Sequence, residues 1–281
     1  MNTAPDTDTR NEVYTLRRGN TPLLLSLPHV GHELPEELHE AYVPRALRSE
    51  DTDWHLERLY DFAHELDLNV IVPRYSRYLI DLNRPPDDTP MYPGAANTEL
   101  CPTRFFTGEP LYREGRAPDA AEVERRRRLY WQPYHDALRA ELDRLRERWG
   151  HALLFDGHSI QSELPWLFDG RLPDLNLGTA DGKSCAPSLR AALQQALEAQ
   201  QEQGFSQVVD GRFKGGYITR HYGRPTERVH AVQLEKCQCL YMDEGRGEGA
   251  SFEFDEARAD RLRPVLRQLL NVMLAWRPEG A

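Results

Sequence analysis

The sequence predicts an α/β fold in which a central sheet is covered by helices on both faces. Short apolar runs of strand length, such as "PLLLSLP" at 22–28 and "NVIVP" at 69–73, alternate with longer segments of helical periodicity. Such alternation favours a sheet with helices packed against both faces. A chain of 281 residues can form this fold as one catalytic domain, 1–281, with residues 1–12 as a polar, frayed start.

The elements of the first half follow from these patterns in chain order. After the strand at 22–28, apolar residues at helical spacing predict a helix over about 51–66. Strands are expected at 69–73 and at 77–84, the second being "RYLIDLNR". The stretch from 85 to 118 is rich in proline and glycine and too long for a simple connector, so we expect an ordered functional loop there.

The second half continues the alternation of helices and strands. A strongly helical segment is expected to be kinked or divided at Pro133, because proline cannot complete the helical hydrogen bonds. The apolar run "ALLFDGHSI" predicts a strand, and a loop region should follow it to about residue 184. The predicted elements are a helix at 120–149, a strand at 152–160, a helix at 187–203, strands near 206–210 and 229–235, and a helix at about 255–276.

Composition excludes several classes of function. The 35 basic and 45 acidic residues give a net charge of −10, which repels nucleic acid and anionic membrane surfaces. Neither is expected as a partner, and no apolar run approaches the roughly 20 residues that span a bilayer. The four cysteines form no CxxC pair, and the N-terminus lacks the pattern of a signal peptide. We therefore expect a cytoplasmic, reduced protein.

Polar side chains gather at the carboxyl ends of four predicted strands. They are His29, Asp81, Asn83, Arg84, Asp156, His158 and Glu235, with His32 close behind the first. Ligands of open α/β sheets bind beyond the carboxyl ends of the strands, where loops carry polar groups above a rigid base. Two histidines and several acids at one edge of a sheet are typical of a metal site, since imidazole and carboxylate are ordinary zinc ligands.

Six sequence motifs between about residues 15 and 245, taken in this order, give a second indication of the fold and function. They are "SLPHVGHELP", "DTDWHLERLYDFA", "YLIDLNRPP", "LLFDGHSI", "FKGGYITRHYG" and "VQLEKCQCLYMDE". Together they resemble the N-formylglutamate amidohydrolase family, and especially its N-formylglutamate deformylase branch of histidine degradation. This family is similar in turn to zinc carboxypeptidases and aspartoacylase. The resemblance therefore implies a mixed central sheet between helices, a phosphorylase/hydrolase-like fold, with one zinc ion at the strand ends.

The resemblance also implies a set of metal ligands. His29 and His158 match the family's histidine ligands, and the acidic ligand should come from "SEDTDWH". Asp53 is favoured because it matches the acid that opens the family's helix, and Glu50 and Asp51 are the alternatives. Three protein ligands leave a position open for water, which is typical of catalytic zinc. Cobalt or manganese could replace zinc in such a site.

The activity implied by the resemblance is zinc-dependent hydrolysis of N-formyl-L-glutamate to formate and L-glutamate. Zinc would activate the attacking water, and Glu235 matches the family's general base, which takes the proton and passes it to the leaving amine. Two alternatives remain open. One is a related zinc hydrolase acting on another N-acyl amino acid or a short peptide, and the other is a ligand-binding domain without catalysis.

The expected partner is a small-molecule N-formyl amino acid with two carboxylates. Burying either carboxylate without a cation would be costly, and arginine can bind one with two parallel hydrogen bonds. Arg84, beside Asn83, resembles the pair that binds carboxylate in aspartoacylase-like enzymes. Arg220 is the second candidate, followed by Lys214 and Arg104. The sequence makes no prediction of oligomeric state.

Overall fold

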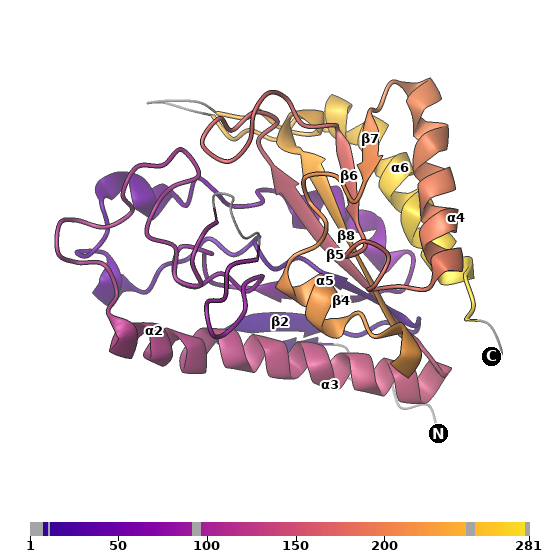
Figure 1. Cartoon of the computed structure of the whole chain (residues 1–281), viewed down its shortest axis with the longest axis horizontal. Coiled ribbons are helices and arrows are strands. Elements are labelled where there is room, and N and C mark those ends of the chain that lie inside the picture. Colours follow the sequence, from indigo (N-terminus) through magenta and orange to yellow (C-terminus); the bar gives the residue numbers. More distant parts are fainter. Residues whose placement is uncertain (1–7, 11, 92–96, 246–250, 279–281) are drawn as a thin grey trace.

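A mixed sheet of eight strands runs through the computed structural model, which describes residues 8–10, 12–91, 97–245 and 251–278 (Figure 1). Across the sheet the strands follow the order β1 (Asp8–Arg10), β2 (Tyr14–Arg17), β4 (Asn69–Pro73), β3 (Leu23–Ser26), β5 (Ala152–Ile160), β8 (Val229–Cys237), β6 (Leu175–Gly178) and β7 (Gln207–Val209). Strands β4, β3, β5 and β8 are parallel, whereas β2 and β6 pair antiparallel with β4 and β8. The predicted mixed central sheet is confirmed.

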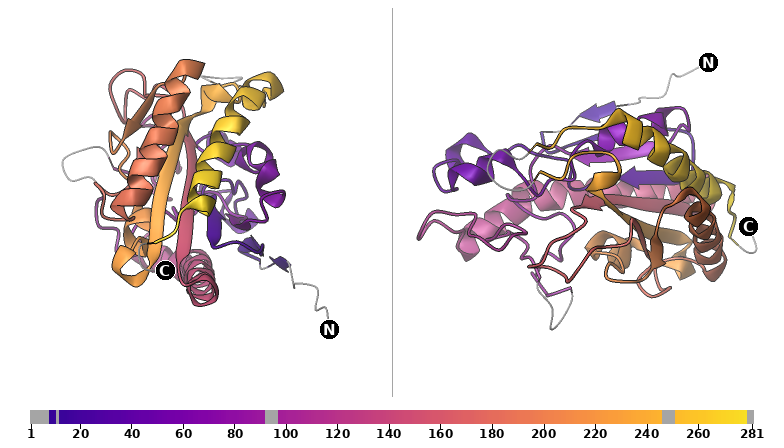
Figure 2. Two further views of the ribbon diagram at one scale, coloured as in Figure 1. Left: turned by 90° about the vertical axis from the view of Figure 1, so that its right-hand side faces the viewer. Right: turned by 90° about the horizontal axis from the view of Figure 1, so that it is seen from above.

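Helices cover both faces of this sheet, as Figure 1 and Figure 2 show. They are α1 (Leu56–Leu59), α2 (Ala120–Arg126), α3 (Gln132–Trp149), α4 (Pro187–Glu198), α5 (Tyr217–Tyr222) and α6 (Glu256–Ala275). Side chains of a strand alternate between its faces. In β5, Leu153 and Phe155 pack with α4 and α6, whereas Leu154 packs with α3 and α5. The buried sheet thus separates two apolar cores.

Most of the long predicted elements are confirmed. The strand at 152–160 and the helix over 120–149 are present, the latter as α2 and α3 joined by a π-helical turn at Arg127–Trp131. Helix α4 continues as a 3-10 turn at Ala199–Gln203, and α6 lies where the last helix was expected. Further 3-10 turns lie at Glu36–Leu38, Pro44–Arg48, Asp61–His64, Pro225–Glu227 and Gln238–Leu240. In its described parts the stretch 85–118 has no helix or strand, only isolated bridges.

The predicted helix over 51–66 is wrong. Only α1 and the 3-10 turn at Asp61–His64 are helical there. The chain is tied down before a helix can begin, because the Asp53 N–H donates to the carbonyl of His29 and His55 has a left-handed φ of 62°. The apolar residues at helical spacing still face the core, but they do so from two short turns.

The predicted strand at 77–84 is also wrong. Its backbone forms successive turns, with the Leu79 N–H donating to Ser76 and the Arg84 N–H donating to Asp81. The carboxylate of Asp81 accepts the N–H of Asn83 at 2.8 Å. Side chains that bond to nearby backbone in this way compete with a strand ladder. The segment therefore consists of turns and adds no strand to the sheet.

Three short strands and one short helix were not predicted. Strands β2 and β6 have only four residues each, too few for a hydrophobic pattern to define a strand, and β6 is buried at every position. The start expected to be frayed contains β1, while residues 1–7 and 11 lie outside the described residues. Helix α5 has six residues and lies between the strands predicted near 206–210 and 229–235. No described helix is both long and apolar enough to cross a membrane.

Candidate metal centre

The carboxyl end of β5 fixes the first residues of the site. Strands β5 and β8 pair residue by residue, so that His158 lies opposite Glu235. Strand β3 ends at Ser26, which pairs with Asp156, and His158 therefore extends beyond the end of β3. The chain leaving β3 brings His29 into this space. Two strands that are far apart in sequence thus deliver two imidazoles to one place.

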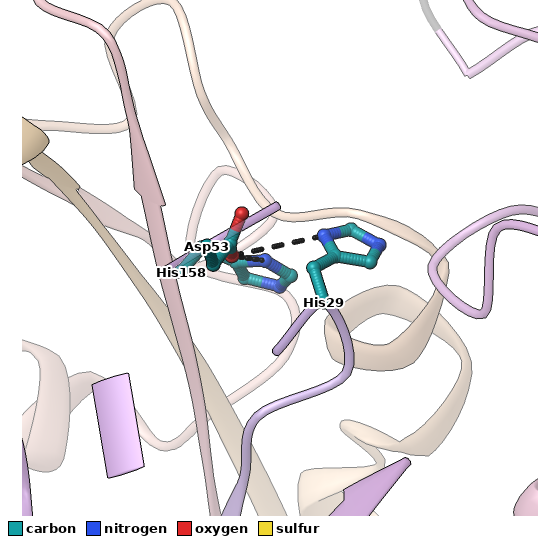
Figure 3. A group of neighbouring side chains, drawn as sticks. All are labelled: His29, Asp53 and His158. Atoms are coloured by element: carbon teal, nitrogen blue, oxygen red, sulfur yellow. Dashed lines mark hydrogen bonds and ion pairs between the residues drawn. The ribbon is translucent and has the colours of Figure 1, made fainter. Parts of the chain in front are cut away.

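His29, Asp53 and His158 meet there as a buried triad (Figure 3). The Asp53 Oδ2 atom lies 3.2 Å from Nδ1 of His158 and 3.8 Å from Nδ1 of His29. One ligand atom from each residue lies within 4.8 Å of the other two, and no other such group of three is present among the described residues. The structure therefore brings together the three residues proposed as ligands.

Each imidazole of the triad is oriented through its other nitrogen. Nε2 of His29 lies 2.8 Å from Oδ1 of Asp81, and Nε2 of His158 lies 3.1 Å from Oδ2 of Asp156. Metal-bound histidines usually donate their second N–H to a carboxylate or carbonyl in this way. The two outer carboxylates thus leave both Nδ1 atoms directed towards Asp53.

The triad fits a divalent metal ion. Nδ1 of His29 is buried and has no hydrogen-bond partner, which leaves its lone pair available for coordination. Two imidazoles and one carboxylate are a common ligand set for catalytic zinc. The alternative acids are engaged elsewhere: Glu50 pairs with Arg45 at 2.8 Å, and Asp51 accepts the N–H of Phe106 at 2.9 Å. Of the three candidate acids, only Asp53 joins the histidines.

The charges around the triad shift its pKa values in opposite directions. Burial acts to raise the pKa of Asp53, but His158, His29 and Arg77 outweigh it and lower the pKa. Burial acts to lower the pKa of His158, but Asp156 and Asp53 outweigh it and raise the pKa to about 10. Because a metal binds only the neutral imidazole, ion binding at His158 must release a proton.

Glu235 lies beside the triad on the neighbouring strand β8. It is buried, and its Oε1 atom has no hydrogen-bond partner. Burial raises the pKa of Glu235 to about 7, although the charge of His158 opposes this effect. A carboxyl group with a pKa near neutrality can both accept and donate a proton at physiological pH.

A cleft opens over the triad and Glu235. The long loop 85–118 contributes Asn97, Thr98 and Phe106 to its lining. The cleft also receives three arginines, Arg77, Arg84 and Arg212. It therefore combines a candidate metal site with several cations.

Only two of the five proposed substrate-binding residues line this cleft. Arg84 does so, and its Nη2 and Nε atoms donate to Oγ1 and the carbonyl of Thr98 at 2.7 and 3.0 Å. Asn83 also lines the cleft, but its side chain is already engaged. Its Nδ2 lies 3.0 Å from Nε2 of His158, and its Oδ1 accepts the N–H of Ile218 at 2.9 Å.

The other three proposed residues do not line the cleft. Lys214 pairs with Asp181 at 2.9 Å. Arg220 is exposed on α5 and donates to the carbonyl of Gly215, and Arg104 is exposed and donates to the carbonyl of Gly108. The sequence positions of these cations gave no indication of the direction in which their side chains point.

Two arginines of the cleft were missed by sequence reasoning. Arg77 is buried, with Nη2 donating to Oδ2 of Asp81 at 2.7 Å and Nη1 lying 3.9 Å from Oδ1 of Asp53. The spacing of four residues between Arg77 and Asp81 was a usable signal, hidden by the expected strand. Arg212 lies two residues before Lys214 and carried no distinguishing signal of its own.

The turn containing Asn83 is supported from below by the long helix. Arg126 donates to the carbonyl of Leu79 at 3.1 Å, and Trp131 donates to that of Arg84 at 3.1 Å. His135 bonds through Nε2 to the carbonyl of Leu82 at 2.9 Å. Arg126 precedes the π-helical turn and Trp131 ends it, and such turns are often found at functional sites.

Gly216 lets α5 approach the same turn from the other side. A Cβ atom at Gly216 would lie 2.3 Å from Nδ2 of Asn83, so no other residue fits without movement. The backbones of the two segments are also joined, because the backbone carbonyl of Asn83 accepts the N–H of Tyr217.

The chain is similar to known proteins over most of its length. The sequence profile of a family described as N-formylglutamate amidohydrolase matches residues 21–242. The N-formylglutamate deformylase of Pseudomonas aeruginosa is 51% identical over 266 residues, covering 95% of this chain and 97% of that protein. The enzyme of the same name from Pseudomonas putida is 49% identical, covering 96% and 98%. A crystal structure of N-formylglutamate amidohydrolase from Ralstonia eutropha JMP134 matches with a TM-score of 0.76 and 27% identity, covering 92% of this chain and 96% of that one.

Proposed function

Because this chain belongs to the N-formylglutamate amidohydrolase family, we propose that it hydrolyses N-formyl-L-glutamate to formate and L-glutamate. The observation that carries the proposal is the buried triad of His29, Asp53 and His158 beside Glu235, at the base of a cleft with cationic walls. Relatives named as deformylases match nearly the whole chain, so the match includes every element that contributes to this cleft.

The triad is the proposed binding site of one divalent ion, with zinc favoured by its ligand set. When bound, such an ion lowers the pKa of water towards neutrality and polarises a carbonyl oxygen. Asp81 and Asp156 would keep the two imidazoles in the binding orientation through their Nε2 atoms.

Glu235 is the proposed general base and acid. Its unpartnered Oε1 atom can accept the proton of the attacking water, and its pKa of about 7 lets it return that proton to the leaving amine. A carboxylate with an ordinary pKa would be a weaker base and would accept the proton of the water less readily. The burial of Glu235 is therefore useful for the first, proton-accepting half of the reaction.

Arg77 is the proposed stabiliser of developing negative charge. Its guanidinium lies beside Asp53 and is fixed by Asp81, so it needs no rearrangement during the reaction. A preorganised cation in a buried site stabilises charge more strongly than water does. Arg84, fixed by Thr98, is the proposed partner of the substrate's α-carboxylate.

The test is formate release from N-formyl-L-glutamate by the purified protein. Activity should disappear after treatment with a chelator and return on addition of zinc, with cobalt and manganese as comparisons. N-formyl-L-aspartate, N-acetyl-L-aspartate and a short peptide should be poorer substrates. Absence of formate under every metal condition would overturn the proposed function, and preference for another N-acyl compound would replace its substrate.

A further inference from the structure

N-formyl-L-glutamate carries a second carboxylate, at the end of its side chain, for which no partner has been given. We propose that Arg212 binds this side-chain carboxylate and thereby makes the enzyme selective for glutamate derivatives. The inference rests on the proposed function and adds to it the determinant of substrate choice. Arg212 lines the cleft together with Leu167 and Phe213.

Arg212 and Arg84 enter the cleft from segments that follow strands in opposite halves of the sheet. Arg84 belongs to the turn that follows β4, whereas Arg212 follows β7. Strands β4 and β7 lie on opposite sides of the central pair β5 and β8, whose ends carry His158 and Glu235. The two guanidinium groups therefore suit a ligand with two separated carboxylates and a reacting group between their supporting strands.

The geometry near the triad assigns the two carboxylates. Asn83 Nδ2 lies 3.0 Å from Nε2 of His158, so the turn carrying Arg84 is adjacent to the reaction centre. The α-carboxylate is attached to the carbon that bears the formylated nitrogen and must lie near that centre. The side-chain carboxylate is two methylene groups further away, and the apolar side chains of Leu167 and Phe213 beside Arg212 suit those methylenes.

Arg212 is also held in place before substrate arrives. Its Nη2 donates to the carbonyl of Leu167 at 3.1 Å. The next residue, Phe213, meets Phe168 edge to face, with ring centroids 6.2 Å apart. Leu167, Phe168 and Phe213 all pack against one apolar cluster that includes Ile160. Fixing a guanidinium in this way reduces the entropy lost on binding a carboxylate.

Other cations near this side of the cleft are less suitable. Lys214, on the same segment, does not line the cleft and pairs with Asp181. Arg77 lines the cleft but is committed to Asp81 and lies beside Asp53. Arginine also matches a carboxylate with two parallel N–H groups, which lysine cannot do. Arg212 is thus the remaining arginine of the cleft for the second carboxylate.

The test compares N-formyl-L-glutamate with N-formyl-L-glutamine, which has the same shape without the second charge. In the zinc-loaded Arg212→Met variant, kcat/KM for the glutamate compound should fall about a hundredfold, the loss expected for a charged hydrogen-bonded contact. For the glutamine compound it should change less than about threefold. Arg212→Lys should restore part of the preference. Arg261→Met, the same change on the exposed face of α6, should match the wild type.

Two results would overturn the assignment. Equal losses on both substrates would mean that Arg212 supports the fold or the chemistry and not selection, and an unchanged preference would mean that it does not contact the side-chain carboxylate. Retained activity on the glutamine compound also shows that the variant is folded.

Calorimetric titration with the product L-glutamate separates this inference from the proposed function. Arg212→Met should weaken L-glutamate binding about a hundredfold and leave L-glutamine binding unchanged. This measurement needs no turnover, so it tests the role of Arg212 even if the wild type releases no formate from either compound. Equal binding of L-glutamate by wild type and variant, or no binding by the wild type, would refute the role of Arg212.

Discussion

The proposed reaction centre and the proposed substrate-binding wall of the cleft are built in different ways. His158 and Glu235 lie on long, fully paired strands, and His29 follows the end of another. Arg84 and Arg212 lie on irregular segments whose positions depend on individual hydrogen bonds to Thr98 and Leu167. Sheet register thus fixes the residues proposed for the chemistry, whereas local side-chain contacts fix those proposed to recognise substrate.

This difference predicts separable effects of mutation. Changes at the strand ends should lower kcat or remove the metal, because these side chains act on the reacting atoms. Changes in the contacts that support the irregular segments should mainly raise KM or lower stability, because they displace groups that bind substrate.

The largest effect should come from a metal ligand. His158→Ala should lower kcat/KM by about four orders of magnitude and abolish stoichiometric zinc binding, because two ligands do not retain the ion firmly. Metal analysis and formate release provide the measurements. His221→Ala, on the exposed side of α5, is the matched control and should keep both. Full zinc content in His158→Ala would show that the triad is not the metal site.

Glu235→Gln should lower kcat about a thousandfold, since general acid and base catalysis is lost while the side chain keeps its size. Zinc content and KM should change little, because Glu235 is not among the three grouped ligand residues. Steady-state kinetics with metal analysis would check both. A parallel loss of zinc would instead make Glu235 a ligand.

The supporting helix should give a pH-dependent effect on stability. Burial lowers the pKa of His135 to about 3, so the folded protein keeps it neutral while the unfolded chain protonates it below its ordinary value of 6.5. The stability it contributes is complete above pH 6.5 and is lost as the pH falls towards 3. Between pH 7 and pH 5 we expect a loss of about 2 kcal/mol from this group.

Denaturant unfolding of wild type and His135→Gln at the two pH values measures this contribution. The variant should show a smaller loss of unfolding free energy than the wild type, by the same amount. His64→Gln, at an exposed position, controls for the general effect of acid. Identical pH dependence in wild type and His135→Gln would show that His135 is charged in the folded protein.

The smallest effect should come from Thr98→Val, which removes the hydroxyl that accepts from Nη2 of Arg84. We expect KM to rise about tenfold with kcat nearly unchanged, the cost of one hydrogen bond to a charged group. Thr103→Val, where the hydroxyl bonds Glu99 at the surface, is the matched control. A fall in kcat without a change in KM would contradict the division between chemistry and recognition.

The same division explains how far the sequence could predict the site. His29, Asp53, His158 and Glu235 were named in advance from strand-end position and family resemblance, and the structure places them together. Strand ends are predictable because an apolar run defines both the strand and its carboxyl end. The roles of these residues remain predictions.

The cationic wall was predicted poorly for a physical reason. The segment 77–84 has the composition of a strand, but the Asp81 carboxylate accepts from the N–H of Asn83 and from Arg77, and so directs the chain into turns. Arg77 was therefore overlooked. Arg212 could not be distinguished from Lys214 or Arg220, because the direction of a side chain on an irregular segment depends on tertiary contacts such as that to Leu167.

The π-helical turn at Arg127–Trp131 sets the rotational phase of the helix beneath the cleft. Arg126 and Trp131 are five residues apart, and in a regular α-helix they would point about 140° away from each other. The wider turn brings both side chains to the same side of the helix. There they donate to the carbonyls of Leu79 and Arg84, which lie in sequence on either side of Leu82, the residue whose carbonyl bonds His135. Deleting one residue from this turn would rotate one half of the helix against the other. A sequence alignment that ignores a one-residue insertion in this turn would therefore mispair every inward-facing side chain on one side of the insertion.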